Sequence, residues 1–152
     1  MKFLCDQMLG TLAKWLRLMG FDTYFADNVT TDDELIAIAH KEKRVLITRD
    51  KTLVQKTKKQ KIPSIEIKTT DLDEQLQKAL QKTKINKKDL LTRCSLCNMV
   101  LNPIEKIKVK NRVPERIFEQ HTDFLYCPKC DKIYWPGTHY KKILEKITTL
   151  NS

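Results

Sequence analysis

Four cysteines in the last third of the chain have the spacing of a metal site. Two Cys-x-x-Cys pairs, Cys94 with Cys97 and Cys127 with Cys130, are separated by 29 residues. Each pair can place two thiolates around one ion from a tight turn, and four thiolates bind zinc in a tetrahedral site. The pattern therefore predicts one structural zinc ion per chain, which stabilises a segment too short to fold on a core of its own. Disulfides or a redox motif are the alternative, but nothing else in the sequence indicates an oxidising compartment.

Acidic residues form a second set whose positions predict chemistry. Asp6 and Asp50 each follow a short apolar segment, and Asp32, Asp33 and Glu34 begin an expected helix. Clustered carboxylates repel one another unless a cation lies between them, and oxygen ligands suit Mg²⁺ or Mn²⁺. Such ions can activate water and stabilise the charge that develops on a phosphodiester during attack. Taken singly, each acid could instead cap a helix, because carboxylates favour helix N-termini.

The elements that must position these acids alternate between strands and helices. Short apolar segments predict strands, and apolar residues three or four apart, with capping signals, predict helices. The strands are expected at Lys2–Cys5, Thr23–Ala26, Val45–Thr48 and Ser64–Ile67, and the helices at 9–19, 31–41, 52–58 and 72–82. Strands that alternate with helices form a parallel sheet with helices on both faces. Because functional groups in such sheets gather beyond the carboxyl ends of the strands, we expect the acids to meet there.

The net charge of +10 is concentrated in the middle of the chain. Residues 51–93 carry 12 Lys or Arg against 5 Asp or Glu, whereas residues 1–50 carry 7 against 8 and residues 94–152 carry 10 against 6. Such a field favours a polyanion, of which nucleic acid is the most common in the cytoplasm, although a solvated lysine-rich face is the alternative. No apolar run has the length of a membrane span, and Asp6 comes too early for a signal peptide. The sequence thus predicts a soluble cytoplasmic protein without membrane contact.

Basic side chains at two further places are candidates for contact with RNA. Between the cysteine pairs lie Lys106, Lys108, Lys110 and Arg112, and on the first helix lie Lys14 and Arg17. The first set alternates with apolar residues, as on a strand that presents one basic face to solvent. The second set has the spacing of one helix face and could hold a substrate phosphate, although exposed helix cations are more often solvated.

Aromatic residues follow the second cysteine pair. Tyr134, Trp135 and Tyr140 could stack on unpaired bases, as aromatic rings do in proteins that bind single-stranded nucleic acid. The alternative that we favour is packing of Tyr134 and Trp135 in the seam between the ribbon and the first domain. His139 lies beside them, and because four cysteines already satisfy zinc we expect a surface or capping role for it.

Four segments of the chain carry a longer pattern. They are residues 3–23 (FLCDQMLGTLAKWLRLMGFDT), 33–39 (DELIAIA), 45–50 (VLITRD) and 134–140 (YWPGTHY). Together they resemble the Mut-seven carboxy-terminal ribonuclease family, and the resemblance spans nearly the whole chain. That family has a PIN-like nuclease domain followed by a zinc ribbon, so the resemblance implies metal-dependent cleavage of RNA.

The resemblance also implies a role for individual acids. It places the first metal-binding aspartate of the PIN pattern on Asp6, and it places the helix acid on Asp33, with Glu34 or Asp32 as the neighbour that could substitute. The Thr-x-Asp element of the pattern falls on Thr48 and Asp50. PIN nucleases commonly carry a further acid in a helix between the first and third strands, and this sequence has no clear match to it. An incomplete metal site is therefore the alternative.

These inferences combine into one prediction of fold and function. A chain of 152 residues can form one modest core and a metal-held appendage. We expect a PIN-like α/β domain over residues 1–90, with a parallel sheet flanked by helices, and a zinc ribbon with a terminal helix, 139–150, over residues 91–152. The predicted activity is endoribonuclease cleavage of single-stranded RNA with Mg²⁺ or Mn²⁺. The alternatives are a non-catalytic RNA- or ribosome-binding module, and a toxin-like partner whose acidic pocket is blocked in a protein complex.

Overall fold

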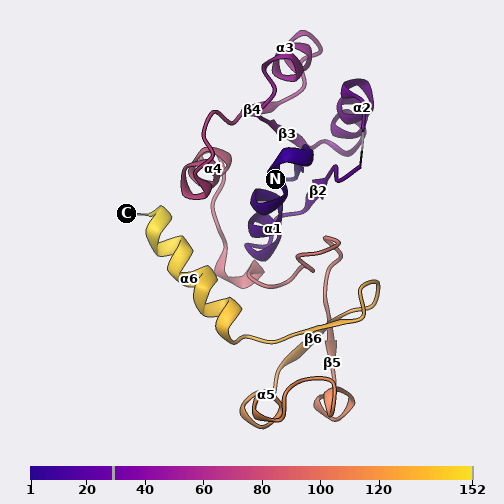
Figure 1. The fold of residues 1–152 in the computed structure, drawn as a ribbon, viewed down its shortest axis with the longest axis vertical. Coiled ribbons are helices and arrows are strands. Elements are labelled where there is room, and N and C mark those ends of the chain that lie inside the picture. Colours follow the sequence, from indigo (N-terminus) through magenta and orange to yellow (C-terminus); the bar gives the residue numbers. More distant parts are fainter. Residues whose placement is uncertain (29, 152) are drawn as a thin grey trace.

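The computed structural model describes residues 1–28 and 30–151, and in it a parallel α/β unit lies above a small antiparallel ribbon (Figure 1). The strands of the first unit are β1 (Phe3–Cys5), β2 (Thr23–Phe25), β3 (Val45–Thr48) and β4 (Ser64–Glu66). Its helices are η1 (Gln7–Leu9, a 3-10 turn), α1 (Gly10–Leu18), α2 (Asp32–Glu42), α3 (Lys51–Lys59), α4 (Leu72–Ala79) and η2 (Lys87–Asp89, a 3-10 turn). Strands and helices alternate through this unit as the sequence predicts.

The four strands of the first unit form one parallel sheet in the order β2-β1-β3-β4. In the register, Cys5 of β1 pairs with Phe25 on one side and with Ile47 on the other. Phe3, Leu4 and Cys5 are all fully buried, as expected for a central strand of a parallel sheet that is covered on both faces. The predicted fold class, a parallel sheet flanked by helices, is confirmed.

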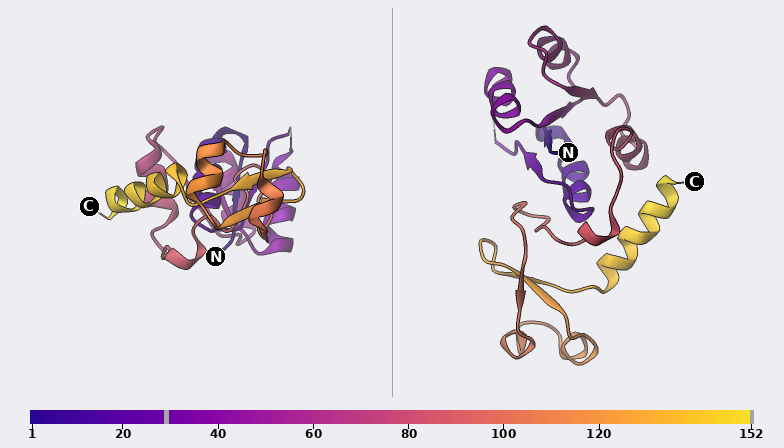
Figure 2. Two further views of the ribbon diagram at one scale, coloured as in Figure 1. Left: turned by 90° about the horizontal axis from the view of Figure 1, so that it is seen from below. Right: turned by 180° about the vertical axis from the view of Figure 1, so that it is seen from behind.

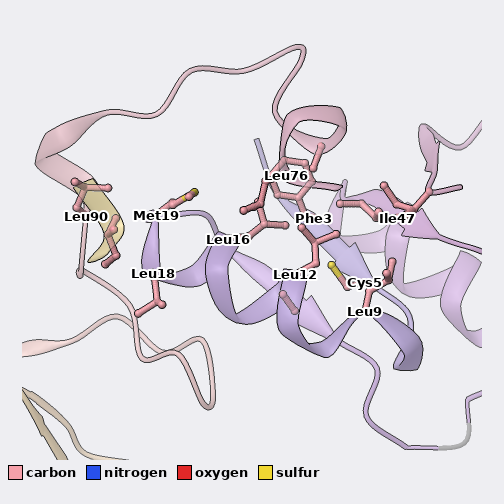
Figure 3. Packing of buried hydrophobic residues seen from close by; sticks show 14 of the residues in the cluster. Phe3, Cys5, Leu9, Leu12, Leu16, Leu18, Met19, Ile47, Leu76 and Leu90 are labelled. Carbon is pink, nitrogen blue, oxygen red and sulfur yellow. The ribbon is translucent and has the colours of Figure 1, made fainter. Parts of the chain in front are cut away.

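Successive residues of β1 enter two separate cores. Phe3 and Cys5 belong to the larger core, which α1 and α4 close through Leu12, Leu16 and Leu76 (Figure 3). Leu4 belongs to the second core, whose other members come mainly from α2 and α3: Leu35, Ile36, Ala39 and Leu53. Burial of one large aliphatic side chain contributes about 1.5–3 kcal/mol. The helices are therefore held to the two faces of the sheet mainly by their apolar stripes.

The ends of two helices follow the predicted capping signals. At the start of α2, the Oγ1 atom of Thr31 accepts a hydrogen bond of 3.2 Å from the N–H of Glu34. After α1, Gly20 has a φ of +97°, in the left-handed region that favours glycine. A Cβ atom at Gly20 would also collide with the backbone of Asp89. This glycine therefore allows η2 to pack against the end of α1.

The ribbon contains three antiparallel strands in the order β5-β6-β7. They are β5 (Asn102–Ile104), β6 (Phe124–Cys127) and β7 (Lys132–Tyr134), and a 3-10 turn, η3 (Lys106–Val109), and a short helix, α5 (Glu115–Gln120), lie between β5 and β6. A small apolar cluster supports the ribbon, with Val109 and Phe124 buried at its centre. The cysteines belong to a separate cluster, together with Leu101 and Tyr134.

The strand expected over the basic residues 106–112 is wrong, because this segment begins with the 3-10 turn η3. Val109 is fully buried, but Ile107 is 69% exposed, so the two apolar residues do not share one face of a strand. Asn111 adopts a left-handed φ of 67°, which turns the chain toward α5. Over so few residues, a 3-10 turn with one buried residue and a strand with one buried face show the same alternation of basic and apolar residues. The sequence alone therefore could not distinguish the 3-10 turn from a strand.

The C-terminal helix α6 (Thr138–Leu150) leaves the ribbon and packs on the α/β unit, beside α4 (Figures 1 and 2). Ile143 is fully buried in the larger core, and the Nζ atom of Lys146 lies 2.7 Å from Oδ1 of Asp73 in α4. A division of the chain near residue 90 stays a prediction, but the core of the first unit includes this helix. With 13 residues α6 is the longest helix of the described chain, and none of the described helices is long and apolar enough to cross a membrane.

Candidate functional site

The order of the strands singles out one place on the sheet. From β1 the chain proceeds to β2 on one side, and it then crosses to β3 on the other side. In open parallel sheets, ligands bind in the crevice beyond the carboxyl ends of the strands at such a switch point. Asp6 directly follows β1, and Thr48 is the last residue of β3. The two residues therefore lie side by side at this switch point, at the carboxyl ends of neighbouring strands.

Thr48 links the two aspartates at this switch point. The Oγ1 atom of Thr48 donates a hydrogen bond to Oδ2 of Asp6. The Oγ1 atom also accepts a hydrogen bond of 3.0 Å from the backbone N–H of Asp50. Thr48 is fully buried and Asp6 is 9% exposed, so this contact is shielded from solvent. The hydroxyl group fixes the orientation of the Asp6 carboxylate relative to the loop that carries Asp50.

Both aspartates also cap helices, as their alternative reading predicts. The Oδ1 atom of Asp6 accepts a hydrogen bond of 3.2 Å from the N–H of Met8 at the start of η1. The Oδ1 atom of Asp50, which is exposed, accepts one of 2.8 Å from the N–H of Thr52 at the start of α3. Capping and ligand binding are compatible, because a carboxylate has two oxygens and about four lone-pair sites.

The acids of α2 lie in its first turn. The Oδ2 atom of Asp32 is 3.2 Å from Nζ of Lys56 in α3, and Asp33 and Glu34 are exposed. Within residues 1–28 and 30–151, one group of three or more Asp, Glu, His or Cys side chains has its ligand atoms within 4.8 Å of one another. That group is the four cysteines. The structure thus brings Asp6, Thr48 and Asp50 together without assembling a three-carboxylate cluster. A joint role of Asp6, Asp33 and Asp50 as ligands of Mg²⁺ or Mn²⁺ stays a prediction.

The four sulfurs predicted to bind zinc do converge. The Sγ atoms of Cys94, Cys97, Cys127 and Cys130 all lie within 4.8 Å of one another, and those of Cys97 and Cys127 are 3.5 Å apart. Tetrahedral zinc with Zn–S bonds of about 2.3 Å requires sulfurs roughly 3.8 Å apart. The donor set and its size therefore fit a metal ion such as zinc.

The backbone around both cysteine pairs forms tight turns. The residues that follow them, Asn98 and Asp131, have φ of 75° and 51°. Asn and Asp are the non-glycine residues that most readily adopt this left-handed conformation. In the second turn the N–H of Cys130 donates to the Cys127 sulfur at 3.4 Å. Each turn thus points its two sulfurs to the same side.

Electrostatics in the cysteine cluster favour a cation. Burial, together with hydrogen bonds to the sulfurs of Cys97 and Cys94, raises the pKa of Cys130 to about 12. Burial alone would raise the pKa of Cys94, but hydrogen bonds from Tyr134 and from the backbone of Leu96 lower it to about 7. Four thiolates at these separations repel one another, so full deprotonation requires a positive ion between them.

Arg17, predicted from the sequence as a phosphate contact, is a buried link between the two units. Its Nε atom donates to the carbonyl of Thr23 at 2.9 Å, and its Nη1 atom donates to those of Ser95 and Leu96 at 3.1 and 3.2 Å. The side chain is 7% exposed. Its guanidinium therefore holds the first cysteine turn against α1 and β2. Because its donors are used in this way, Arg17 is not proposed as a contact to an RNA phosphate.

The remaining basic candidates differ in their surroundings. Lys14, Lys108 and Lys110 are exposed. The Nζ atom of Lys106 lies 4.9 Å from the centre of the Phe118 ring. Arg112 pairs with Asp131 across the ribbon at 2.6 Å, on the surface. Lys14, Lys108 and Lys110 are thus the most available of these side chains for a ligand, and their role in RNA binding stays a prediction.

Asp22 and Asn98 are structurally important residues that the sequence did not single out. The Oδ1 atom of Asn98 accepts a hydrogen bond of 3.0 Å from the N–H of Thr23, and its Nδ2 atom donates one of 2.7 Å to Asp22. Asp22 also pairs with Arg44 at 2.8 Å. The position of Asn98 directly after a Cys-x-x-Cys pair was the only available signal, because its partners are 75 and 76 residues away.

Tyr134 is packed, but its apolar cluster lies within the ribbon, and its place in the seam with the first domain stays a prediction. Its hydroxyl oxygen lies 3.0 Å from the Cys94 sulfur and accepts a hydrogen bond of 3.3 Å from the N–H of Ser95. Trp135 packs edge-on against Phe124, with ring centres 6.5 Å apart. Tyr134 is therefore part of the support of the cysteine cluster.

The parallel sheet covered on both faces, the two aspartates at its switch point and the four-cysteine ribbon define an α/β protein with a ribbon that could hold a metal ion such as zinc. The model of the Mut7-C RNAse domain family matches residues 1–147, and the chain belongs to this family. The predicted family is thus confirmed, and membership indicates a ribonuclease-type role with RNA as substrate or partner. No curated protein and no solved structure matches the chain.

Proposed function

We propose that this chain is a metal-dependent endoribonuclease whose first unit is a PIN-like catalytic domain. The observation that carries the proposal is the position of Thr48, which connects Asp6 and Asp50 at the carboxyl ends of the neighbouring strands β1 and β3. An aspartate after the first strand and a Thr-x-Asp element after the third are the arrangement that the PIN pattern requires. Membership of a ribonuclease-domain family supports the same reading.

In this proposal Asp6, Asp33 and Asp50 hold Mg²⁺ or Mn²⁺, and Glu34 or Asp32 can substitute for Asp33. Carboxylate oxygens are the ligands that these ions prefer. Once bound, such an ion lowers the pKa of its water and offsets the charge that develops on the phosphodiester. The chain contributes by orienting the carboxylates: Met8 and Thr48 hold the two oxygens of Asp6, and Thr52 holds one oxygen of Asp50.

The rest of the chain would hold the RNA and keep the fold intact. A zinc ion on the four cysteines stabilises the ribbon, and exposed lysines of the middle segment 51–93 and of the ribbon contact phosphates of single-stranded RNA. Lys108 and Lys110 are the exposed ribbon lysines with this role, and Lys106 and Arg112 lie beside them. We also propose a cytoplasmic location, where RNA is available as substrate.

The test is an incubation of the purified protein with single-stranded RNA in Mn²⁺, in Mg²⁺ and in a chelator. The parent protein should cut RNA only with a divalent ion. Asp50→Asn should retain the helix cap, because Asn caps as well as Asp, and should lose the charge that balances the ion. Asp123→Asn, at an exposed position in the ribbon, makes the same change in net charge and is the control.

A non-catalytic RNA- or ribosome-binding module is the second candidate. It is favoured by the exposure of Asp33 and Glu34, by the pairing of Asp32 with Lys56, and by the lack of a three-carboxylate cluster in the described chain. RNA binding without cleavage in every divalent ion would establish this function instead.

A further inference from the structure

A small pocket lies at the junction of the two units. It has a volume of about 90 Å³, and three segments bring basic side chains to it: Lys14 from α1, Lys132 from β7 and His139 from the first turn of α6. Trp135 forms part of its wall, and Leu18 and Leu91 contribute apolar surface. The pocket exists only because the ribbon and α6 pack against α1.

The charges around this pocket are of one sign. Over residues 1–28 and 30–151 no Asp or Glu lines it, and neither Lys14 nor Lys132 forms an ion pair there. The pKa of His139 is lowered by burial, and then by Lys132, Lys14 and Lys142. Lysines close enough to act on this imidazole, without a neutralising carboxylate in the lining, create a positive potential at the pocket.

The size and position of the pocket restrict the ligand. Its volume of about 90 Å³ admits a group the size of one phosphate, and the basic side chains that line it suit such an anion. His139 lies in the first turn of α6, whose capping residue Gly137 makes no side-chain cap, and helix N-termini favour anions. The indole of Trp135 offers a surface for the sugar or base attached to the phosphate.

We propose that this pocket binds one phosphate group of the RNA, through Lys14, Lys132 and His139. The identity of the ligand rests on the proposed function, but the binding does not require cleavage. Lys14 lies eight residues after Asp6, on the order of 12 Å along the helical segment at about 1.5 Å per residue. The phosphate in the pocket is therefore a positioning contact, distinct from the phosphodiester that would be cut at Asp6 and Asp50.

Tryptophan fluorescence can detect this binding directly, because the chain has only two tryptophans. In a Trp15→Phe background, Trp135 alone reports on the pocket. The titrants are tetra-adenylate with a 5′-phosphate, the same oligonucleotide with a 5′-hydroxyl, and inorganic phosphate, all in a chelator so that no RNA is cut. If the pocket takes a terminal phosphate, only the first oligonucleotide and inorganic phosphate change the signal, whereas a backbone phosphate gives equal responses to both oligonucleotides.

Variants test the residues. Lys14→Gln removes a positive charge and should weaken oligonucleotide binding by about tenfold, as expected for loss of one charge-assisted hydrogen bond, and His139→Ala, which removes the imidazole donor, should weaken it as well. Lys41→Gln, on an exposed position of α2 far from the pocket in the fold, removes the same charge as Lys14→Gln and should leave the affinity unchanged. Equal affinities for Lys14→Gln, His139→Ala and Lys41→Gln would overturn the proposal. A parent that binds through the pocket but never cuts RNA would refute the nuclease function and keep the pocket.

Discussion

The side-chain amide of Asn98 donates a hydrogen bond of 2.7 Å to the carboxylate of Asp22. Asn98 belongs to the first cysteine turn, and Asp22 immediately precedes strand β2. The same carboxylate pairs with Arg44, whose side chain is 8% exposed, at 2.8 Å. The contact therefore connects the cysteine ribbon to the edge strand β2 of the parallel sheet, and Asp22, like Arg17, helps to set the relative position of the two units.

Replacing Asp22 should destabilise the protein. Asp22→Ala leaves a mostly buried guanidinium of Arg44 and the amide of Asn98 without their shared partner, which costs about 2 kcal/mol in the free energy of unfolding. Urea denaturation followed by circular dichroism gives the value. Asp123→Ala is the control, because Asp123 is exposed and a surface substitution of this kind changes the free energy of unfolding by less than about 0.5 kcal/mol. Equal losses for the two variants would contradict this role of Asp22.

The stability contributed by Asp22 should depend on pH. Burial would raise the pKa of Asp22, but hydrogen bonds from Asn98 and Arg44 outweigh it and hold the pKa below its ordinary value. A carboxyl whose pKa is lower in the folded state stabilises the fold above its unfolded pKa of about 3.9, and this contribution disappears as pH falls through the folded pKa. The stability difference between the parent and Asp22→Asn should therefore shrink below about pH 4. A constant difference down to about pH 2 would exclude the linkage.

Loss of the ribbon metal should separate the behaviour of the ribbon from that of α6. Chelation or Cys127→Ser should increase hydrogen exchange over the two cysteine turns, because protonated or repelling thiols no longer hold them together. Helix α6 should keep its protection, since Ile143 and Lys146 attach it to the α/β unit. Metal analysis of the parent should give one zinc per chain, and Cys5→Ala, at a buried position outside the cluster, should retain it. A protein without zinc, with four freely titratable thiols, would contradict the site.

The outcome for the fold follows from how local each signal is. Strand β3 has the predicted bounds, Val45–Thr48, and Thr31 caps α2 as predicted. Both predictions succeed because the sequence signal for a buried strand or a helix cap lies within a few neighbouring residues. The attachment of α6 to the first core depends on contacts such as that between Lys146 and Asp73, 73 residues apart. The amphipathic pattern of a helix gives its buried face but not the partner that covers it.

The same distinction holds for the candidate site. Asp6 and Thr48 meet because Cys5 pairs with Ile47 in the parallel register, so an acid and a hydroxyl that each end a predicted strand could be expected to be neighbours. The position of the helix acids could not be predicted in this way. The packing of Leu35 and Ile36 in the second core sets how the first turn of α2 is oriented relative to Asp6. That packing leaves Asp33 exposed, and no local pattern reports it.

Removal of the Thr48 hydroxyl should reduce catalysis more than stability. Thr48→Val keeps the shape of the side chain but removes the donor to Asp6 and the acceptor for the N–H of Asp50. Loss of such an outer partner of a metal ligand lowers metal affinity or activity by about 10–100-fold. Thr57→Val is the control, since Thr57 is also fully buried and bonded through its hydroxyl, to Val54 and Ser64. The rate of RNA cleavage as a function of Mn²⁺ concentration distinguishes the two variants, and equal rates would remove Thr48 from the site.

Binding and chemistry should respond to different mutations. If exposed lysines hold RNA through its phosphates, affinity falls steeply with added salt and depends little on base sequence, because bound counterions are released. Replacing Lys106, Lys108 and Lys110 together with Gln should weaken binding and reduce the salt slope, while the cleavage rate at saturating RNA stays near that of the parent. Asp6→Asn should do the opposite, lowering the rate by orders of magnitude with little change in affinity. Filter binding and single-turnover cleavage measure the two quantities separately. A triple variant with the salt slope of the parent would mean that these lysines form a solvated surface, and an Asp6→Asn protein as fast as the parent would place the chemistry elsewhere.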